Sequence, residues 1–324
     1  MARDEREWVE WLRRAAARGG RGGALRLGIG DDAAILRLGR GEDAVVTTDL
    51  FLQDVHFRGD ERASDCGYRC ASRALSDLAA MGAQPVAVFV SLGLPRGAGA
   101  WGHGFFRGLL AASDEAGAVL AGGDLAATAR GVVADIAGFG AVRRERALTR
   151  SGARPGDAIY VSGVLGLAAQ GRLGAARRGG SRDARPSPAA RARHSRPRAR
   201  WELGMALAAR RLATAAMDIS DGLSLDLARL CAASGVGAVV DAERVPRPPG
   251  REGLRLALAG GEDYELLFTV APARMAALGR LHAGGVPVTE IGWITAAGGM
   301  WLRQAGGQSR LEPAGWDHFR RPQR

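Results

Sequence analysis

Periodic and alternating hydrophobic positions divide the first half of the chain into predicted strands and helices. Residues 44–49 alternate as a strand that ends at Asp49, and a helix from Ser64 to about Met81 places apolar residues three or four positions apart. The other elements predicted in this half are helices at 3–18 and 98–116 and strands at 86–93, 117–121 and 132–142. This alternation predicts an α/β or α+β domain that ends near residue 150.

The second half begins with a predicted strand at 158–162. It continues with predicted helices at 201–213, 221–234, 251–259 and 272–283 and strands at 215–219, 237–241, 264–270 and 286–292. The turn-rich sequence RSGARPGD favours a domain boundary there, which gives domains at 1–149 and 150–324. Residues 172–200 are rich in Arg, Ala, Gly, Pro and Ser without a regular period, so we predict a mobile loop at 172–192, ordered at most near 194–200.

The length and composition fit one large or two medium globular domains, and the sequence shows where the charge lies. The chain has 324 residues, 47% of them hydrophobic, and a formal net charge of +11 without a single lysine. Between Arg143 and Arg200, fifteen arginines face three acidic residues, so the excess charge lies in one segment. A nucleic-acid-binding segment usually interleaves aromatic side chains, and this one has only Tyr160. We therefore expect a solvated surface and no nucleic-acid partner, with an acidic partner as the alternative.

Other sequence features point to a cytoplasmic protein without a membrane partner. No apolar run reaches the length of a membrane span, and the first residues are charged rather than apolar. Cys66, Cys70 and Cys231 are too few for a disulfide framework, and their spacing completes no zinc site. Three unpaired thiols are typical of a reducing compartment.

Short patches flanked by glycine or apolar residues carry aspartates that no lysine can neutralise. These aspartates are Asp31 and Asp32 in GIGDDAAIL, Asp49 in TTDL, Asp77 in SDLAAMG, Asp124 in AGGDL, and Asp218 and Asp221 in MDISDGL. A carboxylate beside a strand end or helix is costly to bury unless it is paired or binds a cation. Their accumulation predicts a site for a hard divalent cation, usually magnesium with a phosphate substrate.

Three of these patches also have an ordinary structural interpretation. The Asp31–Asp32 pair fits an exposed turn, TTDL fits a side-chain turn at a strand end, and Asp221 fits a helix N-cap. His56 fits a structural histidine as well as a substrate contact. The sequence contains no Walker loop and no Ser–His–Asp or Cys–His grouping that would favour another mechanism.

The motifs together resemble one enzyme family. GIGDDAAIL, TTDLFLQDVHF, ALSDLAAMGAQP, AGGDL, RALTRSGARPGD, RHSRPRARWELG, MDISDGLSLDL, GGEDYELLF and GWDHF occur in the order seen in thiamine-monophosphate kinases, and the resemblance covers about the whole chain. GDDAA and AGGD are shared with aminoimidazole ribonucleotide synthetases, selenophosphate synthetases and hydrogenase-maturation dehydratases, whereas LTRSGARPGD, DISDGL and GGEDYEL are closer to the kinases. The chain departs from the pattern in its arginine-rich segment at 172–192 and in Trp316, where the family often has tyrosine.

The resemblance implies a fold and an activity. The fold would be the two-domain α/β fold of the superfamily, with the N-terminal sheets pairing into a barrel across a homodimer and a C-terminal α/β sandwich. The activity would be transfer of the γ-phosphoryl group of ATP to thiamine monophosphate with several Mg²⁺ ions and no general base. The alternatives are another ATP-dependent synthetase of the superfamily and, in a different class, an arginine-rich nucleic-acid-binding protein. The absence of any cysteine before Cys66 argues against a selenophosphate synthetase.

The resemblance also implies a role for individual residues. The metal ligands would be Asp32, Thr47, Thr48, Asp49, Asp77, Asp124, Asp218 and Asp221. The ATP contacts would be Gly123, Asp124, Arg150 and Ser220, and the thiamine monophosphate contacts His56, Glu262 and Trp316. Asp49, Asp124 and Arg150 would act in catalysis, with Arg150 as the cation on the transferring phosphoryl group.

Overall fold

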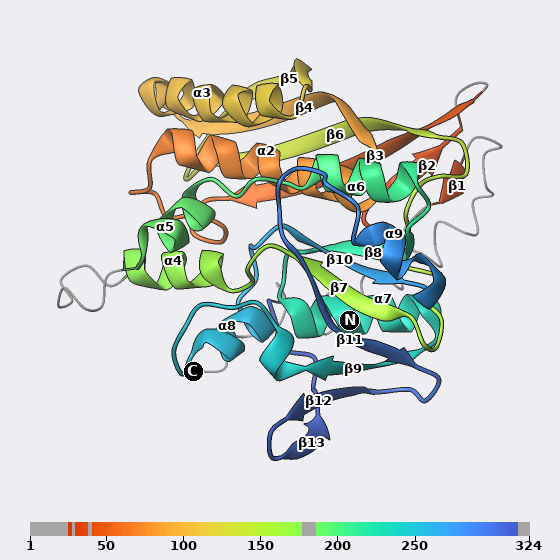
Figure 1. Cartoon of the computed structure of the whole chain (residues 1–324). Coiled ribbons are helices and arrows are strands. Elements are labelled where there is room, and N and C mark those ends of the chain that lie inside the picture. Colours follow the sequence, from red (N-terminus) through yellow and green to blue (C-terminus); the bar gives the residue numbers. More distant parts are fainter. Residues whose placement is uncertain (1–24, 28–29, 38–40, 177–185, 317–324) are drawn as a thin grey trace, which may run out of the picture.

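Two mixed β-sheets and the helices around them make up the chain (Figure 1). The computed structural model describes residues 25–27, 30–37, 41–176 and 186–316, so the helix predicted at 3–18 lies outside the described residues. The first sheet belongs to the first half of the sequence and the second sheet to the second half. The predicted two-domain α/β architecture is confirmed, whereas a barrel across a dimer stays a prediction because the first sheet is not closed in the single chain.

The first sheet has six strands in the order β1-β2-β3-β6-β4-β5. Its strands are β1 (Leu25–Leu27), β2 (Ala34–Leu36), β3 (Glu42–Leu52), β4 (Gln84–Pro95), β5 (Val119–Thr128) and β6 (Val133–Arg143). All neighbours are antiparallel except β4 and β5. Helices α2 (Ala63–Ala80) and α3 (Gly99–Glu115) pack against one face of this sheet. The three-residue strands β1 and β2 were not predicted, because they are too short to show a period.

The second sheet has seven strands in the order β13-β12-β9-β11-β7-β10-β8. Its strands are β7 (Ala158–Ser162), β8 (Ala213–Ile219), β9 (Gly237–Asp241), β10 (Glu265–Val270), β11 (Val288–Thr295), β12 (Met300–Gln304) and β13 (Gly307–Arg310). The helices of this half are α4 (Leu167–Ala176), α5 (Pro188–Ser195), α6 (Trp201–Ala209), α7 (Leu223–Ser234), α8 (Gly253–Ala259) and α9 (Met275–Leu278). The strands predicted at 158–162 and 237–241 have the predicted bounds, whereas the hairpin β12–β13 was missed.

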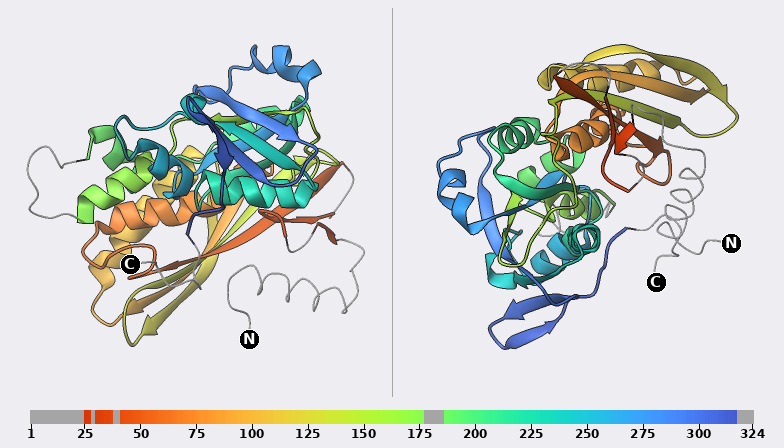
Figure 2. Two further views of the ribbon diagram at one scale, coloured as in Figure 1. Left: turned by 90° about the horizontal axis from the view of Figure 1, so that it is seen from below. Right: turned by 90° about the vertical axis from the view of Figure 1, so that its right-hand side faces the viewer.

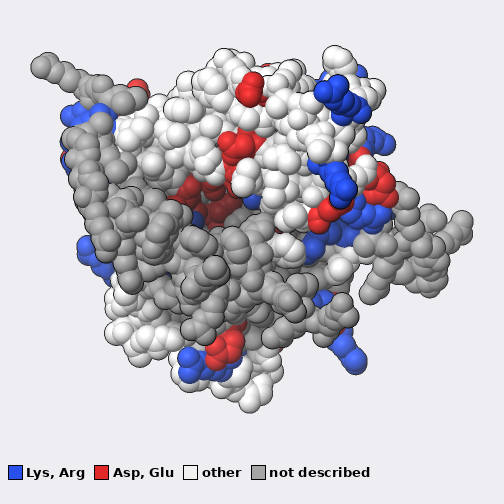
Figure 3. Space-filling model, turned by 180° about the vertical axis from the view of Figure 1, so that it is seen from behind, with Lys and Arg blue, Asp and Glu red and all other residues white. Residues whose placement is uncertain are grey.

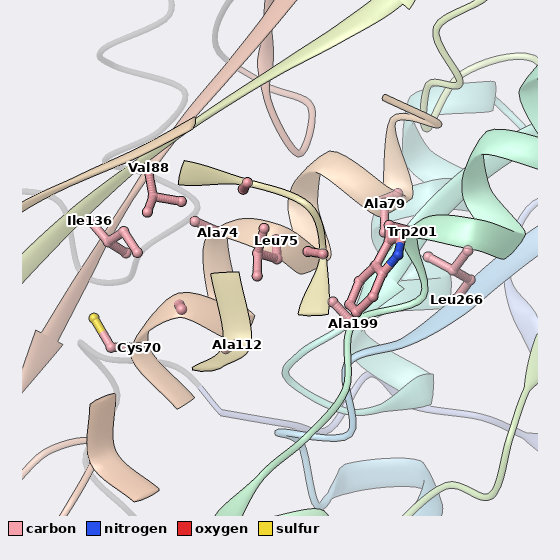
Figure 4. Packing of buried hydrophobic residues seen from close by; sticks show 14 of the residues in the cluster. Cys70, Ala74, Leu75, Ala79, Val88, Ala112, Ile136, Ala199, Trp201 and Leu266 are labelled. Atoms are coloured by element: carbon pink, nitrogen blue, oxygen red, sulfur yellow. The ribbon is translucent and has the colours of Figure 1, made fainter. Parts of the chain in front are cut away.

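Helix α2 lies between the two sheets and shares its core with both (Figures 1 and 2). Figure 4 shows residues of this core, with α2 between Val88 and Ile136 of the first sheet on one side and Trp201 and Leu266 on the other. Alternate residues of the second sheet face the opposite way, into a second core formed with α7 and α8. The second sheet is therefore covered on both faces, and α2 is part of the cover on one of them.

The loop predicted at 172–192 is wrong at both ends. Helix α4 continues to Ala176, and α5 begins at Pro188, where the Ser187 side chain accepts a hydrogen bond from the Ala190 backbone N–H. Serine followed by proline is a helix-start signal, which the compositional argument overlooked. Residues 177–185 lie outside the described part. The helix predicted at 272–283 begins as predicted but is too long, because the 3₁₀ turn at Pro272–Arg274 and the short α9 that follows it end at Leu278.

Arginines of the basic segment pair with acidic residues of the same chain. The expected solvated surface is wrong for Arg193 and Arg200, whereas the side chains of Arg172, Arg196 and Arg198 are exposed. Arg193 and Arg200 both contact Glu265, which is fully buried, and Arg200 makes a bidentate pair with it at 2.6 and 2.7 Å. Further pairs join Arg172 to Glu262, Arg196 to Asp65 and Arg198 to Glu202. These internal partners leave less positive charge for an external one.

None of the described helices combines the length and the apolar composition that crossing a bilayer needs.

The packing of α2 on α3 depends on glycine and provides a test of the fold. A Cβ atom at Gly108 of α3 would overlap the Ser64 carbonyl oxygen, so Gly108→Ala should destabilise the protein by about 1–3 kcal/mol through overpacking. Gly99→Ala in the same helix meets no atom within 4 Å and should change stability by less than about 0.5 kcal/mol. Urea unfolding midpoints measure both, and equal midpoints for the two variants would contradict this account of the packing.

Candidate active site

Three carboxylates from three separate elements meet between the two sheets. Asp32 lies in the turn between β1 and β2, Asp77 on α2 and Asp218 near the end of β8. One carboxylate oxygen from each lies within 4.8 Å of the others. The Thr47 hydroxyl donates to Asp77 at 2.5 Å and the Ser76 hydroxyl to Asp218 at 2.7 Å, which fixes both side chains. Both halves of the chain therefore contribute to one acidic cluster.

The electrostatics of this cluster fit a divalent cation. Burial and the charge of Asp49 raise the pKa of Asp77 well above its ordinary value, and burial and Asp32 do the same for Asp218. The Asp32 Oδ2 atom is buried without a hydrogen-bond partner among the described residues. Oxygen-only donors with excess negative charge and an unused buried oxygen suit Mg²⁺.

Arginines partly balance the aspartates of the site. Arg150 Nη2 lies 2.5 Å from Asp32 Oδ1, and the Arg150 backbone N–H donates to Asp31. Burial and the charge of Asp32 raise the pKa of Asp31 to about 6. Arg229 Nη1 lies 2.5 Å from Asp221 Oδ2. Arg150 is thus placed beside the acidic cluster, at the junction of the two halves.

The strand β3 separates the predicted ligands Thr47, Thr48 and Asp49 by face. Thr47 and Asp49 lie on the side of α2, where both bind its residues, whereas Thr48 is exposed on the opposite face. Asp124 on β5 pairs in register with Ser91 of β4, and both are exposed. Ser91 lies between the buried Val90 and Leu92, so it belongs to the face opposite α2.

The structure therefore brings part of the predicted metal set together. Asp32, Thr47, Asp49, Asp77 and Asp218 share the acidic cluster or its border, while the side chains of Thr48 and Asp124 do not join it within this chain. Gly123, beside Asp124, has a φ of 147°, and a Cβ there would overlap the Val90 carbonyl oxygen. Only glycine fits that position.

The loop that carries Ser220 and Asp221 is held by an aspartate that the sequence analysis missed. Asp226 Oδ2 accepts the backbone N–H groups of Ser220, Asp221 and Gly222 at 3.0–3.1 Å. Burial and the charge of Asp221 raise the pKa of Asp226 to about 7. The sequence offered one signal for this contact: Asp226 follows Gly222 by four residues at the start of a predicted helix, where an aspartate side chain can accept hydrogen bonds from the preceding backbone. The loop is fixed by its own chain before any nucleotide binds.

The predicted substrate contacts His56 and Glu262 meet at Arg69 of α2. Arg69 donates to the His56 carbonyl oxygen and, at 3.1 Å, to Glu262 Oε1. Burial raises the pKa of Glu262, but the charges of Arg69 and Arg172 outweigh it and lower the pKa below its ordinary value. Glu262 therefore remains an anion. The Trp316 backbone N–H donates to the Asp221 carbonyl oxygen at 3.3 Å, and its side chain is 42% exposed.

Arg73, one helical turn after Arg69, was also missed. Its Nη2 donates to Asp49 at 2.9 Å and its Nη1 to the Tyr264 hydroxyl at 3.2 Å. Arg69, Arg73 and Asp77 are spaced by four residues, so they follow one face of α2 from the substrate contacts to the acidic cluster. Long-range pairs of this kind carry no local signal in a sequence.

The face of the molecule seen in Figure 3 is hollowed, and acidic atoms lie within the hollow. An acidic recess of this kind attracts cations before it can accept a phosphate.

Comparisons with known proteins place the chain in a family. Residues 30–142 match the model of the AIR synthase related protein N-terminal domain, and residues 154–303 match that of the C-terminal domain. The thiamine-monophosphate kinase of Escherichia coli (strain K12) is 40% identical over 308 residues, which cover 92% of this chain and 93% of that protein. The chain belongs to the AIR synthase related proteins, within the thiamine-monophosphate kinases.

Solved structures of this family have the same fold. The structure described as AaThiL complexed with AMPPCP and TMP has a TM-score of 0.82 and 28% identity, and the match covers 97% of both chains. The thiamine-monophosphate kinase of Stenotrophomonas maltophilia K279a has a TM-score of 0.74 and 38% identity, with coverage of 90% and 95%. The resemblance predicted from the motifs is confirmed, whereas the roles of single residues stay predictions.

The raised pKa of Asp77 predicts opposite effects of Asp77→Asn with and without magnesium. A carboxyl whose pKa is higher in the folded than in the unfolded state costs stability as the pH rises through that pKa. Asp77→Asn removes this cost and keeps an acceptor for Thr47, so it should raise the thermal unfolding midpoint without magnesium, more at pH 8 than at pH 5.

Magnesium should then stabilise the wild type more than Asp77→Asn, because the variant has lost a ligand charge. Thermal unfolding with and without MgCl₂ measures both effects. Asp114→Asn, on the exposed surface of α3, is the control and should change neither. A metal-free Asp77→Asn protein less stable than the wild type at pH 8 would show that the charge is not a cost.

Proposed function

We propose that this protein transfers the γ-phosphoryl group of ATP to thiamine monophosphate, giving thiamine diphosphate and ADP. The observation that carries this proposal is the acidic cluster of Asp32, Asp77 and Asp218 beside Arg150, in a chain 40% identical to a thiamine-monophosphate kinase. The relative described as complexed with AMPPCP and TMP supports the same pair of substrates, because AMPPCP is an analogue of ATP.

The acceptor in this reaction is a phosphate oxygen, which is already anionic near neutral pH. No side chain has to remove a proton, so the protein has to align the substrates and balance their charge. Mg²⁺ ions, when bound, would neutralise the charge of the phosphates. Asp32, Thr47, Asp49, Asp77, Asp218 and Asp221 would hold these ions, and Arg150 would orient the transferring group.

We assign the ATP side of the site to Gly123, Asp124, Arg150 and Ser220. Asp226 holds the Ser220–Gly222 loop, which pre-organises Ser220 and Asp221 for the nucleotide. Thr48 and Asp124 lie on the other face of the first sheet, so their assignment as metal ligands depends on contacts outside a single chain.

We assign the thiamine side of the site to His56, Glu262 and Trp316. An anionic Glu262 complements the cationic ring system of thiamine, and Arg69 fixes its carboxylate beside His56. The exposed indole of Trp316, next to the Asp221 loop, offers a surface on which a ring can stack.

We also propose that the protein is a cytoplasmic homodimer that uses the first sheet as its interface. The face of this sheet opposite α2 exposes large apolar residues, among them Leu50, Phe89 and Phe139. Phe89 and Phe139 pack edge to face, with ring centroids 5.4 Å apart. An apolar sheet face of this kind is normally covered, and a second copy of the chain would cover it.

Substrate choice provides the first test of this function. Purified protein with ATP and Mg²⁺ should convert thiamine monophosphate to thiamine diphosphate and leave free thiamine unchanged, because the site has no assigned base for an alcohol. ADP release coupled to product chromatography measures both reactions. Turnover of thiamine without turnover of its monophosphate would reject the assignment.

Substitutions of two aspartates test the metal set. Asp49→Asn and Asp124→Asn should each reduce turnover by at least about 100-fold, because each removes a charge that balances phosphate-bound cations. Asp135→Asn is the matched control. Asp135 on β6 pairs in register with Leu50, the residue after Asp49, and with Ser91 of β4, and it has no assigned role. Near-normal turnover of either variant at saturating magnesium would remove that residue from the site.

A further inference from the structure

Asp49, assigned as a metal ligand, is already bound to a side-chain cation. Arg73 Nη2 lies 2.9 Å from Asp49 Oδ1, with the Arg73 side chain 17% and the Asp49 side chain 22% exposed. A half-buried pair is screened less than a surface pair, so its attraction is substantial. A guanidinium keeps its charge at any physiological pH, so Arg73 cannot release Asp49 by losing a proton.

The position of Arg73 is fixed by more than this ion pair. Its Nη1 donates to the Tyr264 hydroxyl at 3.2 Å, and Tyr264 is buried two residues after Glu262 in the chain. Its stem lies on α2, whose neighbouring residues belong to the shared core. Its Nε atom is buried and has no hydrogen-bond partner among the described residues. Arg73 is therefore held in place by several contacts and is not a freely moving surface side chain.

The place of Arg73 has a direct consequence for metal binding. A divalent cation that coordinates Asp49 must either break the hydrogen bond from Arg73 or bind while the guanidinium charge stays a few ångströms away. Either event lowers the affinity of Asp49 for the cation. Arg150 and Arg229 pair with Asp32 and Asp221, but neither contacts Asp49 in the described structure.

We propose that Arg73 is a positioning residue that competes with magnesium for Asp49 and so sets the magnesium concentration at which the site fills. The inference rests on the proposed function, because it takes Asp49 to be a metal ligand. In the metal-free protein Arg73 stabilises the Asp49 carboxylate and keeps it in place. Binding of the first ions has to overcome this pair, so the site fills only at higher magnesium concentration.

Direct magnesium binding to the nucleotide-free full-length protein tests this inference. Arg73→Gln should lower the dissociation constant for Mg²⁺ by at least about tenfold in isothermal titration calorimetry, because a competing charge near the ion is gone. The magnesium-induced rise in the thermal unfolding midpoint should increase in parallel. Arg73→Met, which fills the same space without charge, is the second neutral variant if Arg73→Gln does not fold.

Arg172→Gln is the matched control for charge. It removes one arginine from the same network, where Arg172 contacts Glu262 and not Asp49. Its dissociation constant for Mg²⁺ should stay within about threefold of the wild type, because a partly exposed charge farther from Asp49 is screened. Arg73→Lys, which keeps a positive charge, should stay closer to the wild type than either neutral variant.

Several results would overturn the inference. An unchanged or weaker magnesium affinity in both neutral variants, or an equal gain in Arg172→Gln, would show that Arg73 does not compete at Asp49. A higher Michaelis constant for thiamine monophosphate without a change in magnesium binding would assign Arg73 to the substrate phosphate instead. A wild type that phosphorylates no thiamine monophosphate at any magnesium concentration would reject the proposed function itself, which a turnover assay distinguishes from the first two results.

Discussion

The balance of charge along helix α2 is the constraint on which the site depends. The helix brings two arginines and an aspartate to the boundary between the two sheets, and each of them binds residues far away in the sequence. Because the other face of α2 lies in the shared core, these charges have little freedom to move toward water. Acidic residues from both halves must therefore match the arginines that α2 provides, or bind a metal ion.

This constraint explains why the acidic residues differ in their partners. Asp32 and Asp49 each have an arginine, whereas Asp77 and Asp218 have only hydroxyl donors and a raised pKa. The two carboxylates without a cation are those whose burial costs most in the absence of metal. Stability and metal binding are therefore linked at the same residues.

Much of this site was visible in the sequence, because short motifs carry it. Asp32, Asp77 and Asp218 were predicted from glycine-flanked or apolar-flanked patches, and the structure brings them together. Arg73 was missed because its partners lie 24 and 191 residues away, and no local pattern records such a pair. The hairpin β12–β13 was missed because β12 alternates over only five residues, with an apolar Trp301 on its exposed side, and all four residues of β13 are exposed.

The position of α2 also limits how the protein can move. A hinge motion that separated the two halves would expose α2 residues such as Ala79 together with Trp201 and Leu266, all of them buried in one core. Exposing that much apolar surface is far more costly than moving a loop. The two halves should therefore behave as a single mechanical body, with slow hydrogen exchange along α2, and the motion that admits two phosphate-bearing substrates must come from the loops at the edge of the recess.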